Sequence, residues 1–144
     1  MPGARKRKAA RGRVLSCAAV VIGLGLDLVE LERVERALER WGARLVDKIM
    51  GPEEGGRLPP GAAERARALA LAIAAKEAAS KALGTGWSRG VRWRDVVVDP
   101  GPPPAVRLEG RAAVVARALG STGPVHATLE VRGGIVLGEV RLTS

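Results

Sequence analysis

Two acidic segments of this chain carry the residue types that hold a divalent metal. Asp27 follows the apolar run Gly23-Leu24-Gly25-Leu26, and Glu77 lies in the run Ala74-Ala75-Lys76-Glu77. Carboxylate oxygens suit magnesium, which keeps several waters and completes its octahedron with phosphate oxygens of a substrate. The two segments therefore predict a metal and phosphate site with Asp27 and Glu77 as ligands.

Each of these carboxylates also has an ordinary structural interpretation. Glu77 and Lys81 are four positions apart, so on a helix they could form an exposed ion pair worth about 0.3 kcal/mol. Asp27 could serve as the N-cap of a following helix. From the residues alone, both interpretations stay open beside the metal site.

The residues around Glu77 add chemistry that suits phosphates. Lys76 and Lys81 would point in directions about 140° apart on a helix. Lys81 lies near the face of Glu77 and could contact a phosphate or accept a proton, whereas Lys76 would reach another part of a ligand. Both lysines could instead complement the negative end of a helix dipole. The turn Gly84-Thr85-Gly86 offers backbone amides but is not a complete phosphate loop.

The elements that must position these residues follow from the spacing of apolar side chains. Val14 to Leu26 predicts a buried strand that ends at Gly23 and Gly25, with Asp27 where the strand gives way to a helix. Apolar residues then recur at helical spacing, which predicts an amphipathic helix from Leu28 to near Gly42. Ala62 to Leu83 contains no Gly or Pro and predicts a long helix, apolar on nearly all sides, that Gly84 terminates.

The rest of the chain predicts a loop, short strands and one further helix. Glycine and proline punctuate residues 51–61, which we expect to form a loop. The other expected elements are strands at Val91–Asp99 and Ala105–Leu108, a helix at Arg111–Leu119, and a hairpin of Val125–Leu129 and Ile135–Leu142 around Gly133-Gly134. We therefore expect a single α+β domain over residues 14–144, with a small sheet packed on a long central helix.

The positive charge is concentrated at one end of the chain. The 144 residues carry a net charge of +9 from 24 basic and 15 acidic side chains. Six of the basic residues lie within the first thirteen positions: Arg5, Lys6, Arg7, Lys8, Arg11 and Arg13. Residues 1–13 are typical of a solvated basic arm. Nucleic-acid binding is the lesser alternative, because no aromatic platform accompanies these charges.

The cysteine and aromatic content limits the possible compartment, metal sites and core of the protein. Cys17 is the only cysteine, so an internal disulfide and a cysteine zinc cluster are excluded and a reducing cytoplasm is favoured. No stretch approaches the roughly 20 apolar residues of a membrane span. The hydrophobic fraction is 47%, with three Trp and no Phe or Tyr. Such small apolar residues must either pack closely or share a core with neighbouring subunits.

Two patterns in this chain resemble a known family. The pattern G-x-G-x-D-x-x-E at Gly23 to Glu30 and the pattern A-A-K-E-A-x-S-K-A-x-G-T-G at Ala74 to Gly86 are similar to those of the holo-acyl-carrier-protein synthases. These are the small trimeric 4'-phosphopantetheinyl transferases. Weaker similarity continues through Trp93 to Val98 and the terminal hairpin. The resemblance implies the fold of that family and a homotrimer with its active site between adjacent subunits.

The resemblance also implies an activity and a set of site residues. The implied reaction transfers the 4'-phosphopantetheine arm of coenzyme A to a serine of an apo acyl carrier protein, of fatty-acid or polyketide type, and releases adenosine 3',5'-bisphosphate. Asp27 and Glu77 would bind magnesium, Lys81 and Glu77 would be catalytic, and Arg33 would meet the acidic carrier. The residues implied around the nucleotide are Lys76, Ser80, Gly84, Thr85, Gly86 and the sole histidine, His126, for which a structural role is the alternative.

Four positions depart from the family pattern. The family usually ends in a strand resembling H-V-S-x-[ST]-H, whereas this chain has Glu130 and Val131 at its last two positions. Ala72 and Ile73 stand just before the A-A-K-E run, where basic and aromatic residues are common. A negative charge at Glu130 would oppose a polyphosphate. The alternative is therefore a homologue of the same fold with weakened transfer, which binds a carrier protein or another ligand in a specialised biosynthetic pathway.

Overall fold

The computed structural model describes residues 19–144, so the expected basic arm over residues 1–13 and the expected start of the first strand at Val14 lie outside the described residues. The elements, in chain order, are β1 (Val21–Glu30), α1 (Leu31–Trp41), α2 (Ala43–Ile49), α3 (Pro52–Gly56), α4 (Ala62–Ala82), the 3-10 helix η1 (Trp93–Asp95), β2 (Val96–Asp99), β3 (Ala105–Leu108), α5 (Gly110–Ala118), β4 (Val125–Arg132) and β5 (Ile135–Thr143).

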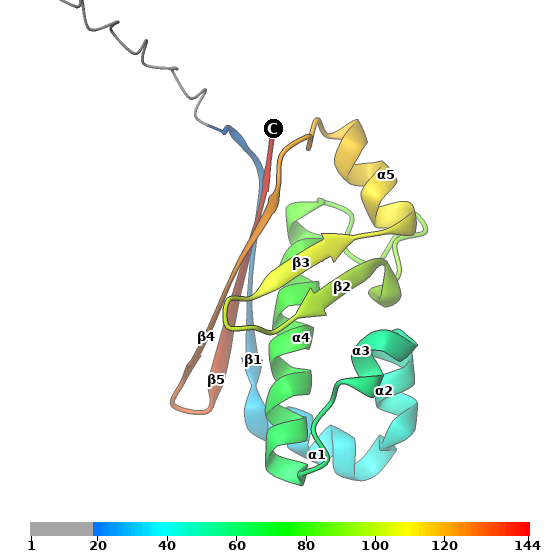
Figure 1. Ribbon diagram of the computed structural model, residues 1–144, viewed down its shortest axis with the longest axis vertical. Coiled ribbons are helices and arrows are strands. Elements are labelled where there is room, and N and C mark those ends of the chain that lie inside the picture. The colour runs from blue at the N-terminus through cyan, green and yellow to red at the C-terminus, as the bar shows by residue number, and fades with distance from the viewer. Residues whose placement is uncertain (1–18) are drawn as a thin grey trace, which may run out of the picture.

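The long helix α4 lies at the centre of the fold, as the sequence predicts. It has 21 residues and ends at the C-cap Leu83, next to Gly84. An antiparallel sheet with strand order β1-β5-β4 packs along one side of α4, while α1 and the small sheet β2-β3 contact it elsewhere (Figure 1). Alanine is the best helix former, and its small side chain lets elements approach from several directions. The buried residues of α4 are therefore mostly alanines, with Leu69 also fully buried.

Glycines in the sheet allow it to lie directly on α4. A Cβ atom at Gly25 would be 1.8 Å from the carbonyl oxygen of Ala78, and one at Gly23 would be 2.4 Å from that of Ala82. These glycines permit a close backbone approach and do not end the strand. The prediction that β1 ends at them was wrong, because β1 continues to Glu30.

Asp27 is consequently a strand residue, not a helix cap. It pairs in register with Gly138 of β5. The N-cap of α1 is Glu30, which makes no side-chain capping hydrogen bond. The alternative interpretation of Asp27 as an N-cap was therefore wrong.

Other segments also differ from the sequence-based expectation. The helix expected from Leu28 begins at Leu31, because β1 continues to Glu30, and the helix α2 was not expected. Part of the expected loop at residues 51–61 is the short helix α3, which has Pro52 at its start, where proline fits a helix. The expected strand at Val91–Asp99 begins with η1, because Asp95 Oδ2 accepts a hydrogen bond of 2.9 Å from the Arg92 amide and closes a turn. The expected strand at Ala105–Leu108 is confirmed as β3. The helix near 111–119 and the terminal hairpin are confirmed as α5, β4 and β5.

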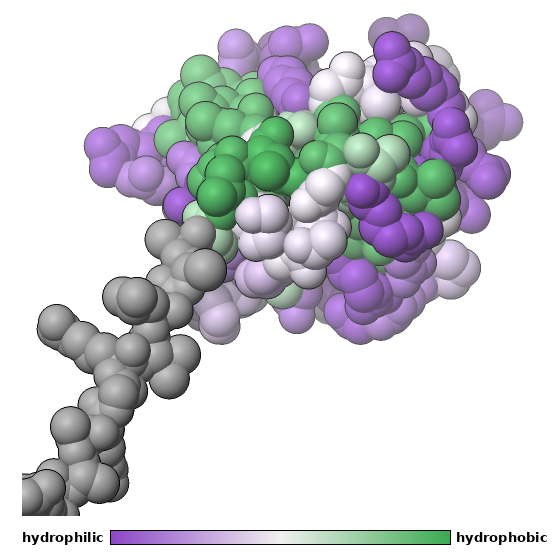
Figure 2. Space-filling view, turned by 90° about the horizontal axis from the view of Figure 1, so that it is seen from above, coloured by the Kyte–Doolittle hydropathy of each residue, from purple (hydrophilic) through white to green (hydrophobic). Residues whose placement is uncertain are grey.

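The main sheet has one covered and one open face. Val136, Val140 and Leu142 of β5 are fully buried on the side that faces α4. On the open face, the exposed fractions are 55% for Leu24, 51% for Leu26, 67% for Leu28 and 37% for Leu137. Figure 2, which views the molecule from above, shows apolar surface gathered beside the point where the grey residues join the described chain. Within residues 19–144, no helix is long and apolar enough to cross a membrane.

Candidate functional site

Asp27 and Glu77 line the same groove although they are far apart in the sequence. The groove has a volume of about 660 Å³ and lies between β1, α1 and α4. Asp27 enters it from β1, Glu77 from α4 and Arg33 from α1. The close packing of β1 on α4 brings the first two residues together. The groove therefore combines three carboxylates, those of Asp27, Glu30 and Glu77, with one guanidinium.

Lys81 is the immediate cationic partner of Asp27. Its Nζ lies 2.7 Å from Asp27 Oδ1 and donates a second hydrogen bond of 3.1 Å to the carbonyl oxygen of Leu26. The alternative of a Glu77–Lys81 ion pair was wrong, because Lys81 turns towards the strand. An ammonium group has three donors, so one N–H of Lys81 is left for a ligand.

The groove suits a magnesium ion that is shared with a phosphate. Within residues 19–144, the Glu77 carboxylate has neither an ion-pair partner nor a side-chain hydrogen bond, and Asp27 already accepts a cation. No group of three or more His, Cys, Asp or Glu side chains in this part of the chain could hold a metal by itself. Magnesium commonly takes one or two carboxylates and completes its shell with water and substrate phosphates. The donor set of Asp27 and Glu77 fits this mode of binding.

Lys76 lies in the core and does not face the groove. Its side chain is fully buried, with Nζ 3.0 Å from Glu54 Oε2 and hydrogen bonds to the carbonyl oxygens of Trp93, at 3.0 Å, and Val96. Burial lowers the pKa of Lys76 and raises the pKa of Glu54, while the attraction between the two charges opposes both changes. Lys76 therefore joins α4 to α3 and β2, and its expected nucleotide contact is not supported.

Ser80 is also an internal residue. It is 1% exposed, and its Oγ donates a hydrogen bond of 2.7 Å to the carbonyl oxygen of Glu77. This bond lies within α4 and leaves the hydroxyl away from the groove surface. We therefore remove Ser80, like Lys76, from the candidate nucleotide contacts.

The turn after α4 uses its glycine amides to end the helix. The amide of Gly84 donates to the Lys81 carbonyl at 3.0 Å, and the amide of Gly86 donates to the Ser80 carbonyl at 3.2 Å. Both glycines have positive φ, at 74° and 56°, which explains their residue type. Thr85 is buried, and its hydroxyl donates to the Gly86 carbonyl. A nucleotide contact by this turn stays a prediction.

His126 and Asp27 lie on opposite faces of the main sheet. His126 is exposed on β4, in register with Arg141 of β5. Asp27 faces α4, where Lys81 contacts it. His126 of one subunit therefore does not reach the groove of that same subunit, and its contact with a nucleotide stays a prediction.

Three of the four departures from the family pattern lie away from the groove. Val131 packs against the core, on the opposite face of β4 from His126. Glu130 forms an ion pair with Arg132, so its negative charge has a local partner. Ala72 is 1% exposed and lies inside the molecule. The fourth departure, Ile73, lines the groove that holds Asp27 and Glu77, where it presents an apolar side chain.

The buried pair of Glu54 and Lys76 is the feature that sequence reasoning missed. Glu54 lies in a glycine-rich segment without apolar periodicity, so nothing in its spacing predicted burial. Its position in the short helix α3, packed close to β2, puts the carboxylate next to Lys76. The absence of Gly and Pro from the α4 segment predicted the helix, but not which of its two lysines would face inwards.

Comparisons with known proteins agree with this fold. The sequence pattern of the 4'-phosphopantetheinyl transferase superfamily matches residues 23–129, and the chain belongs to this superfamily. Two similar relatives are both named holo-[acyl-carrier-protein] synthase. The one from Acidithiobacillus ferrooxidans is 45% identical over 103 residues, which are 70% of this chain and 80% of the relative. The one from Methylobacterium sp. is 44% identical over 115 residues, which are 76% of this chain and 84% of the relative.

Solved structures of the same kind have the same fold. The holo-[acyl-carrier-protein] synthase from Neisseria meningitidis superposes with a TM-score of 0.74 at 27% identity, covering 87% of this chain and all of that one (100%). A holo-(acyl-carrier-protein) synthase from Bacillus anthracis, solved in complex with CoA (3',5'-ADP), superposes with a TM-score of 0.68 at 25% identity. The alignment covers 88% of this chain and 99% of that protein. The expected α+β transferase fold is therefore confirmed.

Proposed function

We propose that this protein transfers the 4'-phosphopantetheine arm of coenzyme A to a serine hydroxyl of an apo acyl carrier protein. The relatives named as holo-[acyl-carrier-protein] synthases support the reaction, and the complex of the Bacillus anthracis protein supports coenzyme A as the donor. The observation that carries the proposal is the groove that Asp27 and Glu77 line, with Lys81 in contact with Asp27. Two carboxylates and an ammonium group beside an open space suit a metal-bridged pyrophosphate.

The residues in and beside the groove have different chemical roles in this reaction. Asp27 and Glu77 would hold a magnesium ion, which would neutralise pyrophosphate charge when bound. The serine oxygen attacks the phosphorus that carries pantetheine, and the bond to the bridging oxygen breaks, so that adenosine 3',5'-bisphosphate leaves. Glu77 accepts the serine proton on the carboxylate oxygen that does not hold the metal, because no side chain of the described residues pairs with this carboxylate. The third N–H of Lys81 contacts the phosphate on which negative charge grows.

The carrier protein would approach along α1 and α2. Arg33, Arg36 and Arg40 project from one side of α1, and Arg33 also lines the active groove. Trp41, Arg44 and Lys48 continue this surface around a hollow of about 270 Å³. Basic side chains around an exposed tryptophan suit an acidic helix with an apolar anchor. This surface leads the modified serine towards Asp27 and Glu77.

The open face of the main sheet would be the interface of a homotrimer. Its exposed leucines are Leu24, Leu26, Leu28 and Leu137. Three of these leucines alternate along β1 and Leu137 pairs with Leu28, so they form one exposed apolar stripe, which marks an interaction surface. Such an assembly also gives His126 a role, because the exposed outer face of β4 in one subunit could lie beside the groove of the next. We further propose a cytoplasmic location, which the single cysteine favours.

A mass measurement tests the proposed reaction directly. The protein is incubated with coenzyme A, magnesium and an apo carrier, and the carrier should gain the mass of the phosphopantetheine arm. Glu77→Gln should abolish this gain, whereas Glu64→Gln, an exposed position on the same helix and outside the groove, should leave it unchanged. Circular dichroism checks that both variants are folded. Full activity of the Glu77→Gln variant would reject the assigned role.

A further inference from the structure

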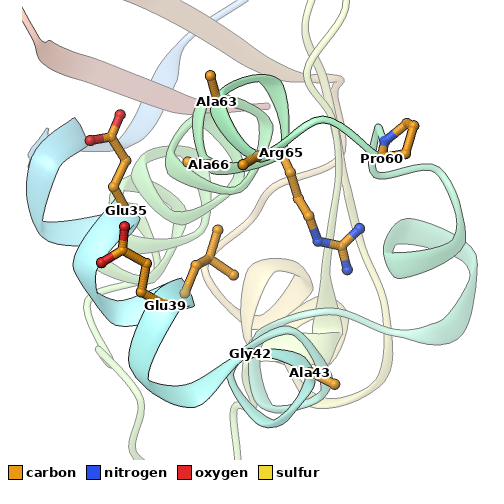
Figure 3. Close-up of a pocket in the computed structure, with 10 residues that line it drawn as sticks. Glu35, Glu39, Gly42, Ala43, Pro60, Ala63, Arg65 and Ala66 are labelled. Atoms are coloured by element: carbon orange, nitrogen blue, oxygen red, sulfur yellow. The ribbon is translucent and has the colours of Figure 1, made fainter.

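A second groove lies between α1 and the beginning of α4, away from the Asp27–Glu77 groove. Its volume is about 480 Å³, and its apolar lining comes from Leu38, Ala43, Pro60, Ala62, Ala63 and Ala66. Glu35 and Glu39 of α1 stand along one side (Figure 3). Arg65 also lines the groove, but its guanidinium extends away from the two glutamates in this view. The groove is thus apolar at its base and acidic along one rim.

The acidic rim belongs to a charge-separated helix. On a helical projection of α1, Glu32, Glu35 and Glu39 fall on one stripe, and Arg33, Arg36 and Arg40 fall on the neighbouring stripe. Arg36 pairs with Glu32 at 3.3 Å. Within residues 19–144, Glu35 and Glu39 have no ion-pair partner. The α1 helix therefore presents two carboxylates without an ion-pair partner to the groove, against the single lining cation Arg65, and this acidic rim favours a cationic occupant.

We propose that the basic segment Arg5-Lys6-Arg7-Lys8 of this chain docks in the α1–α4 groove, with its charges on Glu35 and Glu39. The charge of the two partners is complementary: four consecutive cations meet an apolar channel with two free carboxylates. A short run of basic residues can lay its methylene stems on apolar surface while its charged ends reach the rim. The contact itself does not depend on the enzymatic reaction.

The length of the preceding chain decides which basic residues can reach the groove. The start of β1 lies at the end of α4, since Gly23 faces Ala82, and the groove lies at the beginning of α4, at Ala62 and Ala63. The helix between them is about 31 Å long. From residue 19, an extended chain reaches about 36 Å by Lys8 and about 43 Å by Lys6, but only about 26 Å by Arg11. The docking segment is therefore Arg5 to Lys8, and Arg11 and Arg13 span the gap.

This contact has a consequence for the carrier protein, which rests on the proposed function. The acidic stripe of α1 lies beside the arginines that would bind an acidic carrier, well within the screening length of about 10 Å at 0.1 M salt. Left uncovered, Glu35 and Glu39 repel the carrier. Covering them with the basic segment removes this repulsion, so the segment strengthens carrier binding without touching the carrier.

Crosslinking tests the contact without using the reaction. A water-soluble carbodiimide joins lysine amines to nearby carboxylates, and mass spectrometry of the digested full-length protein identifies the joined peptides. Links from Lys6 or Lys8 to Glu35 or Glu39 are expected, and they should disappear in the Glu35→Gln/Glu39→Gln variant. Absence of these links, or links from these lysines to acidic residues elsewhere only, would overturn the proposal.

A double-mutant cycle tests the consequence by direct carrier binding, measured as fluorescence anisotropy of a labelled apo carrier. Lys6→Gln/Lys8→Gln should weaken binding roughly threefold at low salt, as expected for two exposed charge pairs. Arg11→Gln/Arg13→Gln removes the same charge but should change binding less. In the Glu35→Gln/Glu39→Gln background, the effect of the Lys6 and Lys8 changes should vanish. An equal effect in both backgrounds means that the arm contacts the carrier itself and refutes the screening role, whereas loss of transfer alone would bear only on the proposed function.

Discussion

Replacing Lys76 with methionine should show how strongly the buried ion pair holds this fold together. Methionine keeps the length and apolar character of the side chain but removes the ammonium group. The change leaves the buried Glu54 carboxylate without its cation, and it removes the hydrogen bonds to the carbonyl oxygens of Trp93 and Val96. Three elements, α3, η1 and β2, thereby lose their polar attachment to α4.

The expected loss in the free energy of unfolding is large for a single substitution. Breaking a buried pair by removing one partner costs about 3–5 kcal/mol, and each abandoned buried carbonyl is part of that penalty. For a protein of this size, a loss of about 4 kcal/mol lowers Tm by about 12 °C. Removing the second charge as well, in Lys76→Met/Glu54→Met, should restore at least about 1 kcal/mol, because no unpaired carboxylate then remains in the core.

Urea unfolding followed by circular dichroism measures these free energies. Lys81→Met is the matched control, because the same residue type on the same helix is 51% exposed and pairs with Asp27 near the surface. The control should cost under about 1 kcal/mol. A Lys76→Met variant that loses less than the control would refute the assignment of Lys76 to the core.

The pH dependence of this variant has a definite sign. Burial raises the pKa of Glu54, and the charge of Lys76 opposes that rise. Without Lys76, the pKa of folded Glu54 rises further above its unfolded value, so the variant is most stable at low pH and loses stability as the pH rises through the folded pKa. The stability difference between wild type and Lys76→Met should therefore grow between about pH 5 and about pH 8. A difference that shrinks over this range would contradict the reasoning.

Three other changes test the packing, the carrier surface and the assembly. Gly25→Ala would put a Cβ atom 1.8 Å from the Ala78 carbonyl oxygen, so it should reduce both thermal stability and magnesium-dependent transfer. Gly56→Ala is the control and should reduce neither, because there is open space around Gly56. Arg33→Glu should raise the KM for the carrier at least about tenfold while leaving the KM for coenzyme A unchanged in steady-state kinetics, because it reverses one carrier-facing charge. Leu26→Glu should convert the proposed trimer to monomers in light scattering, and an unchanged trimer would show that the open face of the sheet is not the interface.

The positions of the long elements followed from sequence because their signals are local. Alanine content marked α4, and helical spacing marked α1. The resemblance of Gly23–Glu30 and Ala74–Gly86 to a known family further led to Asp27 and Glu77, which the structure places in one groove. The end of β1 was mispredicted because Gly25 was treated as a strand breaker, although its local conformation is extended. A glycine is required at this position by the close approach of Ala78, which is distant in sequence.

The partners of individual side chains were harder to predict because they depend on packing between elements. Helical spacing offered Glu77 as the partner of Lys81, but Asp27 on the neighbouring strand takes its place. Similarly, helical geometry predicted that Lys76 and Lys81 point in different directions. It did not predict that the direction of Lys76 leads into the core. Only the position of α3, a helix with little sequence signal, explains why a cation is buried there.

The contact of β1 with α4 has a consequence for the choice of metal ion. Gly23 and Gly25 place the backbone of β1 directly against the backbone of α4, which holds the strand and the helix at a fixed close distance beside Asp27 and Lys81. Magnesium demands short, nearly octahedral bonds, whereas calcium is larger and needs more oxygen ligands. Because the groove cannot widen, we expect it to discriminate between these ions by their radius. The selectivity would then originate in the two glycines, which lack the side-chain carbon that would push the strand away from the helix.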